Sequence, residues 1–530
     1  MGWIFGIIGK YSESDEQTFN KIHSNPLHIK KQNSIYLAAG GIKETCLCGN
    51  FNDLSTEYSG WVISGVGINF WNDQFSFMTQ KDWAEVLVNK NPVLQNLDGH
   101  FVAVKWKENK AICFTDQLGL RNLYLLQNKY FTAFSTRLDW LSKLSDKCDI
   151  DLETFGERWL LINQLSYNSI LKNTKRLTQG GIAVCTPQGI SVQNNLWNPD
   201  TENYSKNESF SNLLDKLSCF PMLEGKKISL GLSGGLDSRV LLSLLTSSNS
   251  DNWCLHSVGF PNDPDLQIAK KISAELTTEH LFIRPEIPNQ KECFKQLYEY
   301  VGQTLGCLLS SNFLKLNYYS LLYNQNKIVI DGGQGEIARR ELFNRLFLFG
   351  KKFILNGSLE KIYPFVASHR ASFFKTEVLA IMRNGAVSAI KELKEKLPPV
   401  KEIGIERWLD YFILRCRFPN LTNIEQSRSD SEFVNYMPFA QPSVIGKIFE
   451  IPVDEIYNGK LLKKIIKEKD KRLLKYPRVK NGIYMPFNLS TFSARVWLKV
   501  KGKLGRQYHN PLPLKLLENM SEFVQDTVNS

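Results

Sequence analysis

The chain has 530 residues, enough for several domains with a sizeable core. Its 43% hydrophobic and 22% charged residues are typical of a folded globular protein and argue against extended disorder. A net charge of +12 indicates an anionic partner. No apolar run approaches the ~18 residues of a membrane span, and the start MGWIFG lacks a basic signal-peptide n-region, so we expect a cytoplasmic protein. The ten cysteines show no zinc-binding spacing.

The first part of the chain has the pattern of strands. Residues 1–10 predict a buried strand, and residues 97–104 predict a turn followed by an alternating strand. Residues 114–124 repeat strand, turn and strand. The stretch 197–209 is polar and rich in turn residues, so we predict a domain boundary near residue 205.

Residues 227–245, KISLGLSGGLDSRVLLSLL, predict a strand, a glycine loop and a helix. Glycines let the backbone approach an anion, a helix N-terminus offers unpaired N–H groups, and Ser233 and Ser238 add hydroxyl donors. The loop is therefore predicted to bind phosphate, although it lacks the Gly-Lys-Ser/Thr of a Walker A loop. Asp237 would repel that phosphate unless a cation lay between them, which predicts Mg²⁺.

The rest of the chain alternates strands with helices. Residues 253–260, 280–283 and 327–330 predict further strands, so we expect a parallel sheet with its ligand at the carboxyl ends. His256 and His280 flank strands and are interpreted as structural. The region 338–467 is helix-rich, and its Arg339 and Arg340 could meet an acidic substrate or form a solvated helix face. In the tail, residues 493–506 alternate apolar and basic side chains, which favours an exposed extension over contact with an anionic surface.

The SGGLDS loop resembles the pyrophosphate-binding loop of ATP pyrophosphatases, and it resembles the signature of the synthetase domain in the asparagine synthetase family. That family includes β-lactam synthetases and lasso-peptide cyclases. Residues 327–336 (KIVIDGGQGE) resemble the family's LSGxGxDE segment, 458–464 its GKxxLR segment, and 478–482 its RxKxG segment. Residues 435–442 (NYMPFAQP) resemble its RxPFLD turn, with departures at Tyr436 and Gln441.

The N-terminal part resembles class II glutamine amidotransferases. Its start is similar to their M-C-G-I-x-G, and residues 97–104 and 114–124 are similar to LDGxFA and RDxxGxxPLYY. Gly2 stands where those enzymes have the nucleophilic cysteine, and glycine has no side chain to attack an amide. Residues 60–90 hold no counterpart of the glutamine-binding NGEIYN segment. The resemblance thus implies a domain that does not hydrolyse glutamine and is structural.

The resemblance implies a two-domain protein of mixed α/β and α+β class. Residues 1–205 are expected to form an inactive Ntn-hydrolase-like αββα antiparallel sandwich. Residues 206–530 are expected to form a parallel sheet of the adenine-nucleotide α-hydrolase type with a helical C-terminal part.

The resemblance also assigns the site. Lys460 and Lys480 are the expected catalytic residues, and Asp237 and Glu336 the expected Mg²⁺ ligands. Gly333 stands where relatives carry a catalytic Glu or Tyr, so the base must come from Glu341, the substrate or an already free amine. The residues expected to bind ATP are Leu232, Ser233, Gly234, Gly235, Asp237, Ser238, Ser257, Val258 and Gly332.

The function implied is an ATP-dependent ligase. It would activate a small-molecule or peptide carboxylate as its acyl-adenylate, release pyrophosphate and AMP, and join the acyl group to an amine or ammonia. ATP and pyrophosphate suffice as anionic partners, so nucleic acid is not required, and a homodimer is compatible with this reading. Two alternatives stay open: an ammonia-dependent asparagine synthetase, and a catalytically weak nucleotide-binding scaffold. The scaffold is less favoured because a dead site needs none of the charges of Asp237, Glu336, Lys460 and Lys480.

Overall fold

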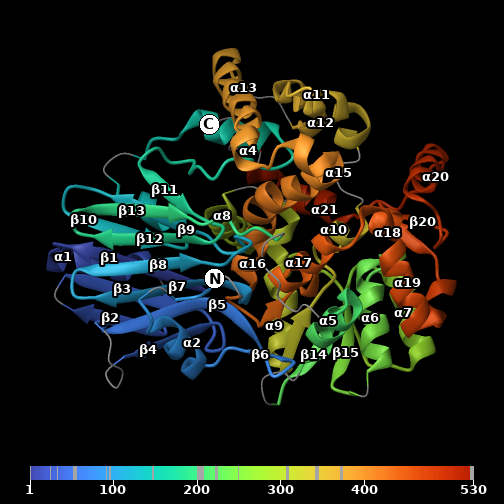
Figure 1. Cartoon of the computed structure of the whole chain (residues 1–530), viewed down its shortest axis with the longest axis horizontal. Coiled ribbons are helices and arrows are strands. Elements are labelled where there is room, and N and C mark those ends of the chain that lie inside the picture. Colours follow the sequence, from blue (N-terminus) through green and yellow to red (C-terminus); the bar gives the residue numbers. More distant parts are fainter. Residues whose placement is uncertain are drawn as a thin grey trace.

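The computed structural model shows two antiparallel sheets beside a parallel sheet with many helices (Figure 1). It describes residues 2–23, 25–32, 34–51, 57–90, 92–94, 97–145, 148–199, 208–220, 225–248, 250–305, 310–340, 345–370, 374–523 and 525. The predicted mixture of an antiparallel first half and a parallel second half is confirmed. The predicted boundary near residue 205 lies outside the described residues.

The first half is a sandwich of two antiparallel sheets. One sheet has the order β11 (Thr174–Leu177), β9 (Leu123–Gln127), β10 (Phe131–Ser135), β1 (Trp3–Gly9), β3 (Ile35–Gly40) and β2 (His28–Gln32). The other has the order β13 (Gly189–Asn194), β12 (Gly181–Thr186), β8 (Lys110–Thr115), β7 (Asp98–Lys107), β5 (Gly60–Trp71) and β4 (Cys46–Asn50), with β6 (Gln74–Phe77) paired to β5.

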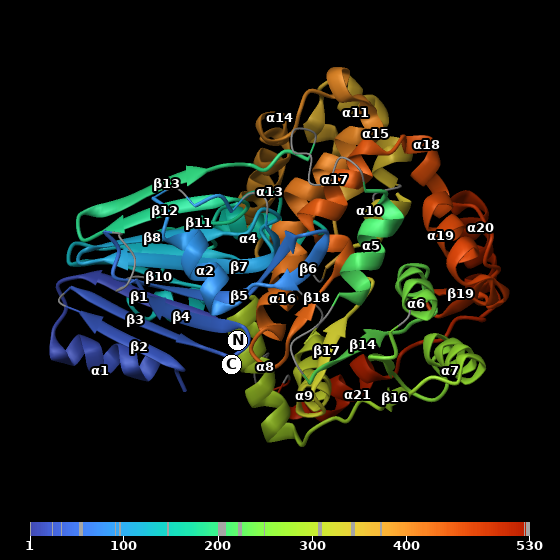
Figure 2. The ribbon, with the colours of Figure 1, turned by 60° about the horizontal axis from the view of Figure 1, so that its bottom comes forward.

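Alternation along these strands creates three apolar layers. Ile4 and Ile8 of β1 pack between the sheets against Val62 and Val104 of the second sheet. On one outer face lie α1 (Glu13–Ile22) and α3 (Leu138–Ser142), and on the other lies α2 (Gln80–Leu87). The result is four layers in the order helix, sheet, sheet, helix (Figures 1 and 2).

The second half is built on a five-stranded parallel sheet. Its order is β16 (His280–Ile283), β15 (Trp253–Val258), β14 (Lys227–Gly231), β17 (Lys327–Ile330) and β18 (Asn435–Tyr436). Because β14 is central, its carboxyl end lies between those of β15 and β17. The helices that precede, follow or connect these strands are α5 (Phe210–Cys219), α6 (Asp237–Ser247), α7 (Pro264–Leu276), α8 (Gln290–Thr304) and α9 (Lys315–Asn324).

The region 338–467 is rich in helices, as predicted, and it contains the short strand β18. From the first half, α4 (Leu152–Leu160) packs against α13 (Thr376–Lys391). Elements used below are α10 (Glu336–Arg339), α15 (Val400–Phe412), α16 (Asn423–Ser429), α17 (Pro442–Glu450), α18 (Val453–Ile456), α19 (Lys460–Lys469), β19 (Arg478–Lys480), β20 (Ile483–Met485), α20 (Thr491–Lys503) and α21 (Leu512–Asn519). Among the described residues, no helix is long and apolar enough to cross a membrane.

A buried polar cluster joins the two halves. Arg121, fully buried after β8, donates to the Asp430 carboxylate at 2.6 Å, and Asp430 directly follows α16. His100 Nε2 lies 2.9 Å from the other Asp430 oxygen. Nearby, the Asp98 carboxylate accepts from the Ser443 N–H (2.9 Å) at the start of α17, and burial raises the pKa of Asp98 to about 6. The halves are thus held together by charges withdrawn from water.

Replacing Arg121 with Met should destabilise the whole chain, because it leaves the Asp430 carboxylate buried beside an apolar side chain. We expect the free energy of unfolding in urea to fall by about 3–5 kcal/mol. The matched control is Lys81→Met, which removes an exposed pair with Glu85 and should change that value by less than about 0.5 kcal/mol. Equal stability of the two variants would mean that the buried contact does not hold the halves together.

Candidate active site

The loop between β14 and α6 is organised around two serines. The Ser233 N–H donates to Ser238 Oγ at 3.3 Å, and the Gly235 N–H donates to Ser233 Oγ at 3.2 Å. Helix α6 begins at Asp237 without a side-chain cap, so its first amide groups are left for an anion. Beyond the loop, Val240, Leu241, Leu244 and Leu245 are buried and fix the helix against the sheet.

This loop borders a cavity of about 340 Å³ at the carboxyl ends of the parallel strands. That volume suits a small molecule. Of the nine residues expected to bind ATP, all except Gly234 line it. Its lining comprises Gly231, Leu232, Ser233, Gly235, Asp237, Ser238, His256, Ser257, Val258, Asp265, Leu266, Tyr319, Asp331, Gly332 and Gly333.

The end of β15 supplies polar groups to this cavity. Ser257 Oγ donates to the Leu232 carbonyl at 2.6 Å, which fixes the strand against the loop. His256 is held through Nδ1 by Ser229 Oγ at 2.9 Å, and burial lowers its pKa to about 3. Its Nε2 is buried and has no partner among the described residues. A buried ring nitrogen without a hydrogen-bond partner is unusual, so a polar atom of a ligand in the cavity could form a hydrogen bond with it.

Gly234 seats the hairpin of β19 and β20 on the loop. The Val479 N–H donates to the Gly234 carbonyl at 2.9 Å, and a Cβ at 234 would lie 2.5 Å from Val479 Cγ2. Arg239 of α6 is fully buried and donates to the carbonyls of Tyr476 (2.7 Å) and Gly234 (3.2 Å). These contacts hold β19 against the glycine loop. Lys480, the last residue of β19, therefore lies near the cavity.

The predicted metal ligands are each paired with an arginine. Asp237 lies 3.0 Å from Arg339 Nε, and Glu336 lies 3.2 Å from Arg417 Nη2. Only Asp237 is among the residues that line the cavity. The described residues contain no group of three or more His, Cys, Asp or Glu that could hold a metal alone. Mg²⁺ needs only one or two carboxylates when nucleotide phosphates supply the other oxygens, so Asp237 fits such an ion.

A carboxylate fills the place that Gly333 leaves. Asp331 follows β17, lines the cavity, and accepts from the Gly333 N–H at 2.6 Å. A Cβ at position 333 would lie 2.6 Å from Asp331 Oδ1 and 2.6 Å from Met437 Sδ, so a side chain there would collide with both. Burial raises the pKa of Asp331 above the ordinary value of an aspartate. The Asp331 carboxylate thus lies where a side chain at position 333 would begin.

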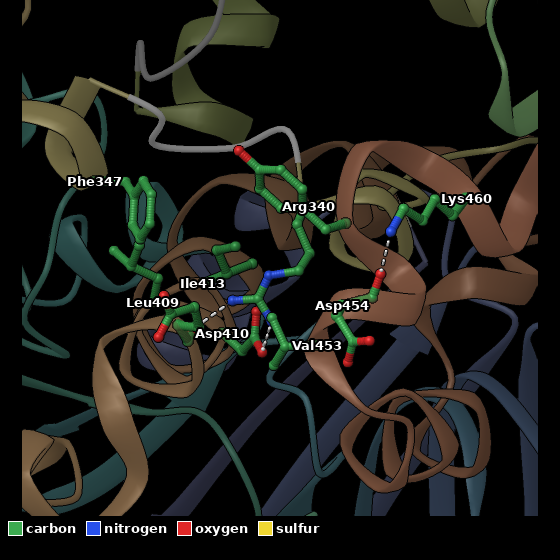
Figure 3. A pocket seen from close by; sticks show the side chains of 10 residues that line it. Arg340, Phe347, Leu409, Asp410, Ile413, Val453, Asp454 and Lys460 are labelled. Atoms are coloured by element: carbon green, nitrogen blue, oxygen red, sulfur yellow. Dashed lines mark hydrogen bonds and ion pairs between the residues drawn. The ribbon is translucent and has the colours of Figure 1, made fainter. Parts of the chain in front are cut away.

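A second cavity, of about 450 Å³, opens beside Lys460 (Figure 3). Its walls are mostly apolar and include Phe347, Leu409, Ile413 and Val453. Its lining residues are Arg340, Phe347, Glu406, Leu409, Asp410, Ile413, Val453, Asp454, Tyr457 and Lys460.

The charges of this second cavity are partly neutralised. Arg340 donates to Asp410 at 2.8 Å, and burial raises the pKa of Asp410 to about 6. Lys460 Nζ donates to the Asp454 carbonyl at 3.0 Å. Because Arg339 and Arg340 both form ion pairs, the alternative of a solvated arginine pair is wrong. Lys460 borders this cavity, whereas Lys480 lines neither of the two.

The place of the missing nucleophile is occupied from the second half of the chain. The Gly2 carbonyl accepts from Arg121 Nη2 at 2.6 Å, and the same guanidinium binds Asp430. A Cβ on Gly2 would lie 3.1 Å from the Asp430 carbonyl oxygen and 3.2 Å from Ser64 Oγ. Gln441, a departure from the family turn, accepts here from the Gly99 N–H at 2.7 Å. The Asp430 carbonyl oxygen and Ser64 Oγ thus occupy the space next to the Gly2 Cα.

Sequence reasoning missed two acidic residues that line the cavity beside the glycine loop, and it missed Arg239, which holds that loop. Asp331 and Asp265 could have been found, because each lies shortly after a predicted strand of the parallel sheet. Arg239 gave no signal, since its partner Tyr476 lies 237 residues away. Glu341, one of the groups considered as a base, lies outside the described residues.

Comparison with known proteins identifies the central segment. Residues 222–312 match the family model described as asparagine synthase, in agreement with the motifs of this segment. No curated protein matches the chain.

Two solved structures are similar to parts of the chain. Glutamine phosphoribosylpyrophosphate amidotransferase from B. subtilis is 9% identical over 62% of this chain and 81% of that one, with a TM-score of 0.23. NH3-dependent NAD synthetase from Campylobacter jejuni is 19% identical over 42% of this chain and 90% of that one, with a TM-score of 0.19. At these scores, neither likeness carries an argument about function.

Glutamine should not serve as a nitrogen donor. We expect the purified protein to form no glutamate from glutamine, because Gly2 offers no nucleophile. The variant Gly2→Cys should be equally inactive, since the space in front of the new thiol is filled by Asp430 and Ser64. The measurement is glutamate release under conditions that include ATP and Mg²⁺. Glutamate formation in proportion to the amount of wild-type protein would contradict the assignment.

Proposed function

We propose that the chain is an ATP-dependent ligase that forms a carbon–nitrogen bond. In the first step a carboxylate oxygen attacks the α-phosphorus of ATP, which gives an acyl-adenylate and releases pyrophosphate. In the second, an amine or ammonia attacks the acyl carbon and AMP leaves, with one proton given up by the nitrogen. The observation that carries the proposal is the glycine-loop cavity with Asp237 at a helix N-terminus, in a segment that matches the asparagine synthase family model.

The cavity offers ATP the groups that it needs. We assign the phosphates to the loop of Ser233, Gly235 and Ser238, where hydroxyl groups and helix amides can donate. Ser257, Val258 and Gly332 border the remainder of the same space, where the nucleoside would lie. The unpartnered Nε2 of His256 is available to a polar atom of that nucleoside. Gly234 acts indirectly, by seating the hairpin.

Magnesium would be held by Asp237, with Glu336 as the second ligand proposed from its motif. When bound with ATP, the ion neutralises phosphate charge and orients the leaving pyrophosphate. In the protein alone, the Arg339 and Arg417 side chains balance these two carboxylates. Arg339 is thereby placed to turn toward a phosphate oxygen when Asp237 engages the ion.

Lys460 and Lys480 are the proposed catalytic cations. Lys480 belongs to the strand clamped on the loop through Val479, so it suits the charge that develops at the acyl centre. Lys460 follows Gly459, where a Cβ would lie 2.9 Å from Leu236 of the loop, so it lies between the loop and the second cavity. We assign Lys460 to the departing pyrophosphate.

The second cavity is the proposed site of the body of one substrate. Its apolar walls and volume of about 450 Å³ favour a molecule larger and less polar than aspartate. Arg340 is paired with Asp410, so the other charged side chains in the lining are those of Glu406, Asp454 and Lys460. This lining carries more negative than positive charge and therefore disfavours aspartate as the substrate. It supports the ligase proposal over an asparagine synthetase proper. A scaffold without catalysis has no need of a second cavity with Lys460 at its border.

Asp331 is the proposed base for the attacking nitrogen. It lines the cavity beside Gly333, and burial raises its pKa, which makes its carboxylate a stronger proton acceptor than an ordinary aspartate. Its carboxylate is held by the Gly333 N–H, which fixes its direction. This assignment adds a candidate to the substrate, the free amine and Glu341.

The first test of the proposal is the variant Asp237→Ala. Pyrophosphate release with Mg²⁺, a panel of carboxylates and either ammonia or amines should fall by about 10² or more, because the ion loses its ligand. The matched control is Asp251→Ala, which removes an exposed carboxylate before β15 and should leave the rate unchanged. Magnesium-dependent turnover at the wild-type rate in Asp237→Ala would refute the role of this residue.

The second test separates the two chemical steps. Asp331→Asn should lower the rate of amide formation by about 10² to 10⁴, while pyrophosphate release in the adenylation step continues. The rate of amide formation in the wild type should rise with pH through a pKa above the ordinary carboxyl range, and this acid limb should vanish in the variant. Asp265→Asn removes another partly buried carboxylate of the same cavity and should keep the limb. Retention of the limb in Asp331→Asn would exclude it as the base.

A further inference from the structure

The positive charge of the chain is concentrated in one segment. Residues 460–506 contain fifteen lysines and arginines against two acidic residues, which gives this segment a net charge of +13, whereas the whole chain has +12. The remaining residues are therefore close to neutral together. The segment forms α19, β19, β20 and α20, which lie at one edge of the molecule in Figures 1 and 2. One nucleotide with its pyrophosphate does not require so large a charge.

Helix α20 at this edge has an exposed apolar row. Phe492, Val496, Val500 and Leu504 follow one another at intervals of four residues, from the helix to its C-cap, and are 74%, 49%, 50% and 63% exposed. Side chains at this spacing lie one above the next on a helix. One exposed face of the helix is therefore an apolar row that runs along its whole length.

Basic side chains run beside this row. Arg495, Lys499 and Lys503 repeat at the same interval, one position before each apolar residue that follows, and Arg506 continues beyond the helix. Among the described residues, none of these four forms an ion pair with an acidic side chain. No Asp or Glu occurs between residues 471 and 506.

The opposite face of α20 is the one that contacts the protein. Ala494 is buried, and the Trp497 ring N–H donates to the Tyr484 carbonyl of β20 at 2.8 Å. Lys501 lies over the same indole ring, with its Nζ 4.7 Å from the ring centroid. The orientation of the helix is thus fixed by the hairpin, and the apolar row with its basic neighbours points away from the body.

We propose that α20 docks the protein on an anionic membrane surface. A helix of this kind lies in the interface plane, with its apolar row between the acyl chains and its lysines and arginines at the anionic headgroups. In the neighbouring α19, the exposed Lys467 adds to the basic surface, whereas Lys464 is paired with Glu468 at 4.0 Å. The docking would place the substrate cavity beside Lys460 close to the membrane. This inference is independent of the ligase proposal.

The apolar row decides between an anionic membrane and nucleic acid. Phosphate backbones are bound by basic and polar groups, and they offer nothing to a row of aliphatic side chains on a helix. A lipid interface receives both kinds of side chain at once. A second copy of this chain would need an acidic apolar face to match, whereas the residues outside 460–506 carry no large net charge in either direction.

The experiment is flotation of the full-length protein with lipid vesicles. The wild type should bind vesicles of phosphatidylcholine with about 30% phosphatidylglycerol and should not bind pure phosphatidylcholine. The double variant Phe492→Ser/Val500→Ser should bind the anionic vesicles at least about tenfold more weakly. Lys499→Glu/Lys503→Glu should lose at least about fivefold per residue. Both changes lie on exposed positions, and circular dichroism checks that each variant remains folded.

Matched controls test whether binding depends on α20 and not on any exposed apolar or basic side chain. Trp71→Ser removes an equally exposed apolar side chain from the first half, and Lys81→Glu/Lys295→Glu reverses two exposed charges elsewhere, so both should bind as the wild type does. Failure of the wild type to bind anionic vesicles would overturn the proposal. So would unchanged binding by Phe492→Ser/Val500→Ser, which would indicate a purely electrostatic surface. Conversion of a dimer to a monomer by that variant, without vesicle binding, would assign the face to a second copy instead.

Discussion

The buried contact between Arg121 and Asp430 is the interaction on which the arrangement of the two halves depends. It joins residues 309 positions apart, and the same guanidinium holds the carbonyl of Gly2. Both charges are withdrawn from water, so neither can lose its partner without a large cost in free energy. Gly2 stands where relatives have a nucleophile, and the groups around it instead hold the second half of the chain.

The second half shows an analogous replacement. Position 333 has no side chain, and the carboxylate of Asp331 lies where one would project. Around it the glycine loop, the β19 hairpin and α10 are locked by Arg239 and by the pairing of Asp237 with Arg339. The groups around the cavity are therefore fixed by contacts within the protein, which is what stabilisation of a charged transition state requires.

The sequence predicted the local features of this site well. A strand, glycines and a helix at 227–245 follow from hydrophobic spacing and turn residues, and most of the residues assigned to the nucleotide do line one cavity. It predicted less well which charges face one another. Arg339 and Arg340 looked like a surface pair, because local pattern does not reveal partners such as Asp410, 70 residues away. Asp430 gave no local signal for the same reason, because its ion-pair partner Arg121 comes from the other half.

The central claim, that a carboxylate is activated by adenylation, is tested most directly by isotope exchange. The protein is incubated with ATP, Mg²⁺, labelled pyrophosphate and apolar carboxylates in turn, without any amine. The account predicts that label enters ATP only when a suitable carboxylate is present, because formation of the acyl-adenylate is reversible. Formation of ADP and phosphate in place of this exchange, with the same carboxylates, would contradict it.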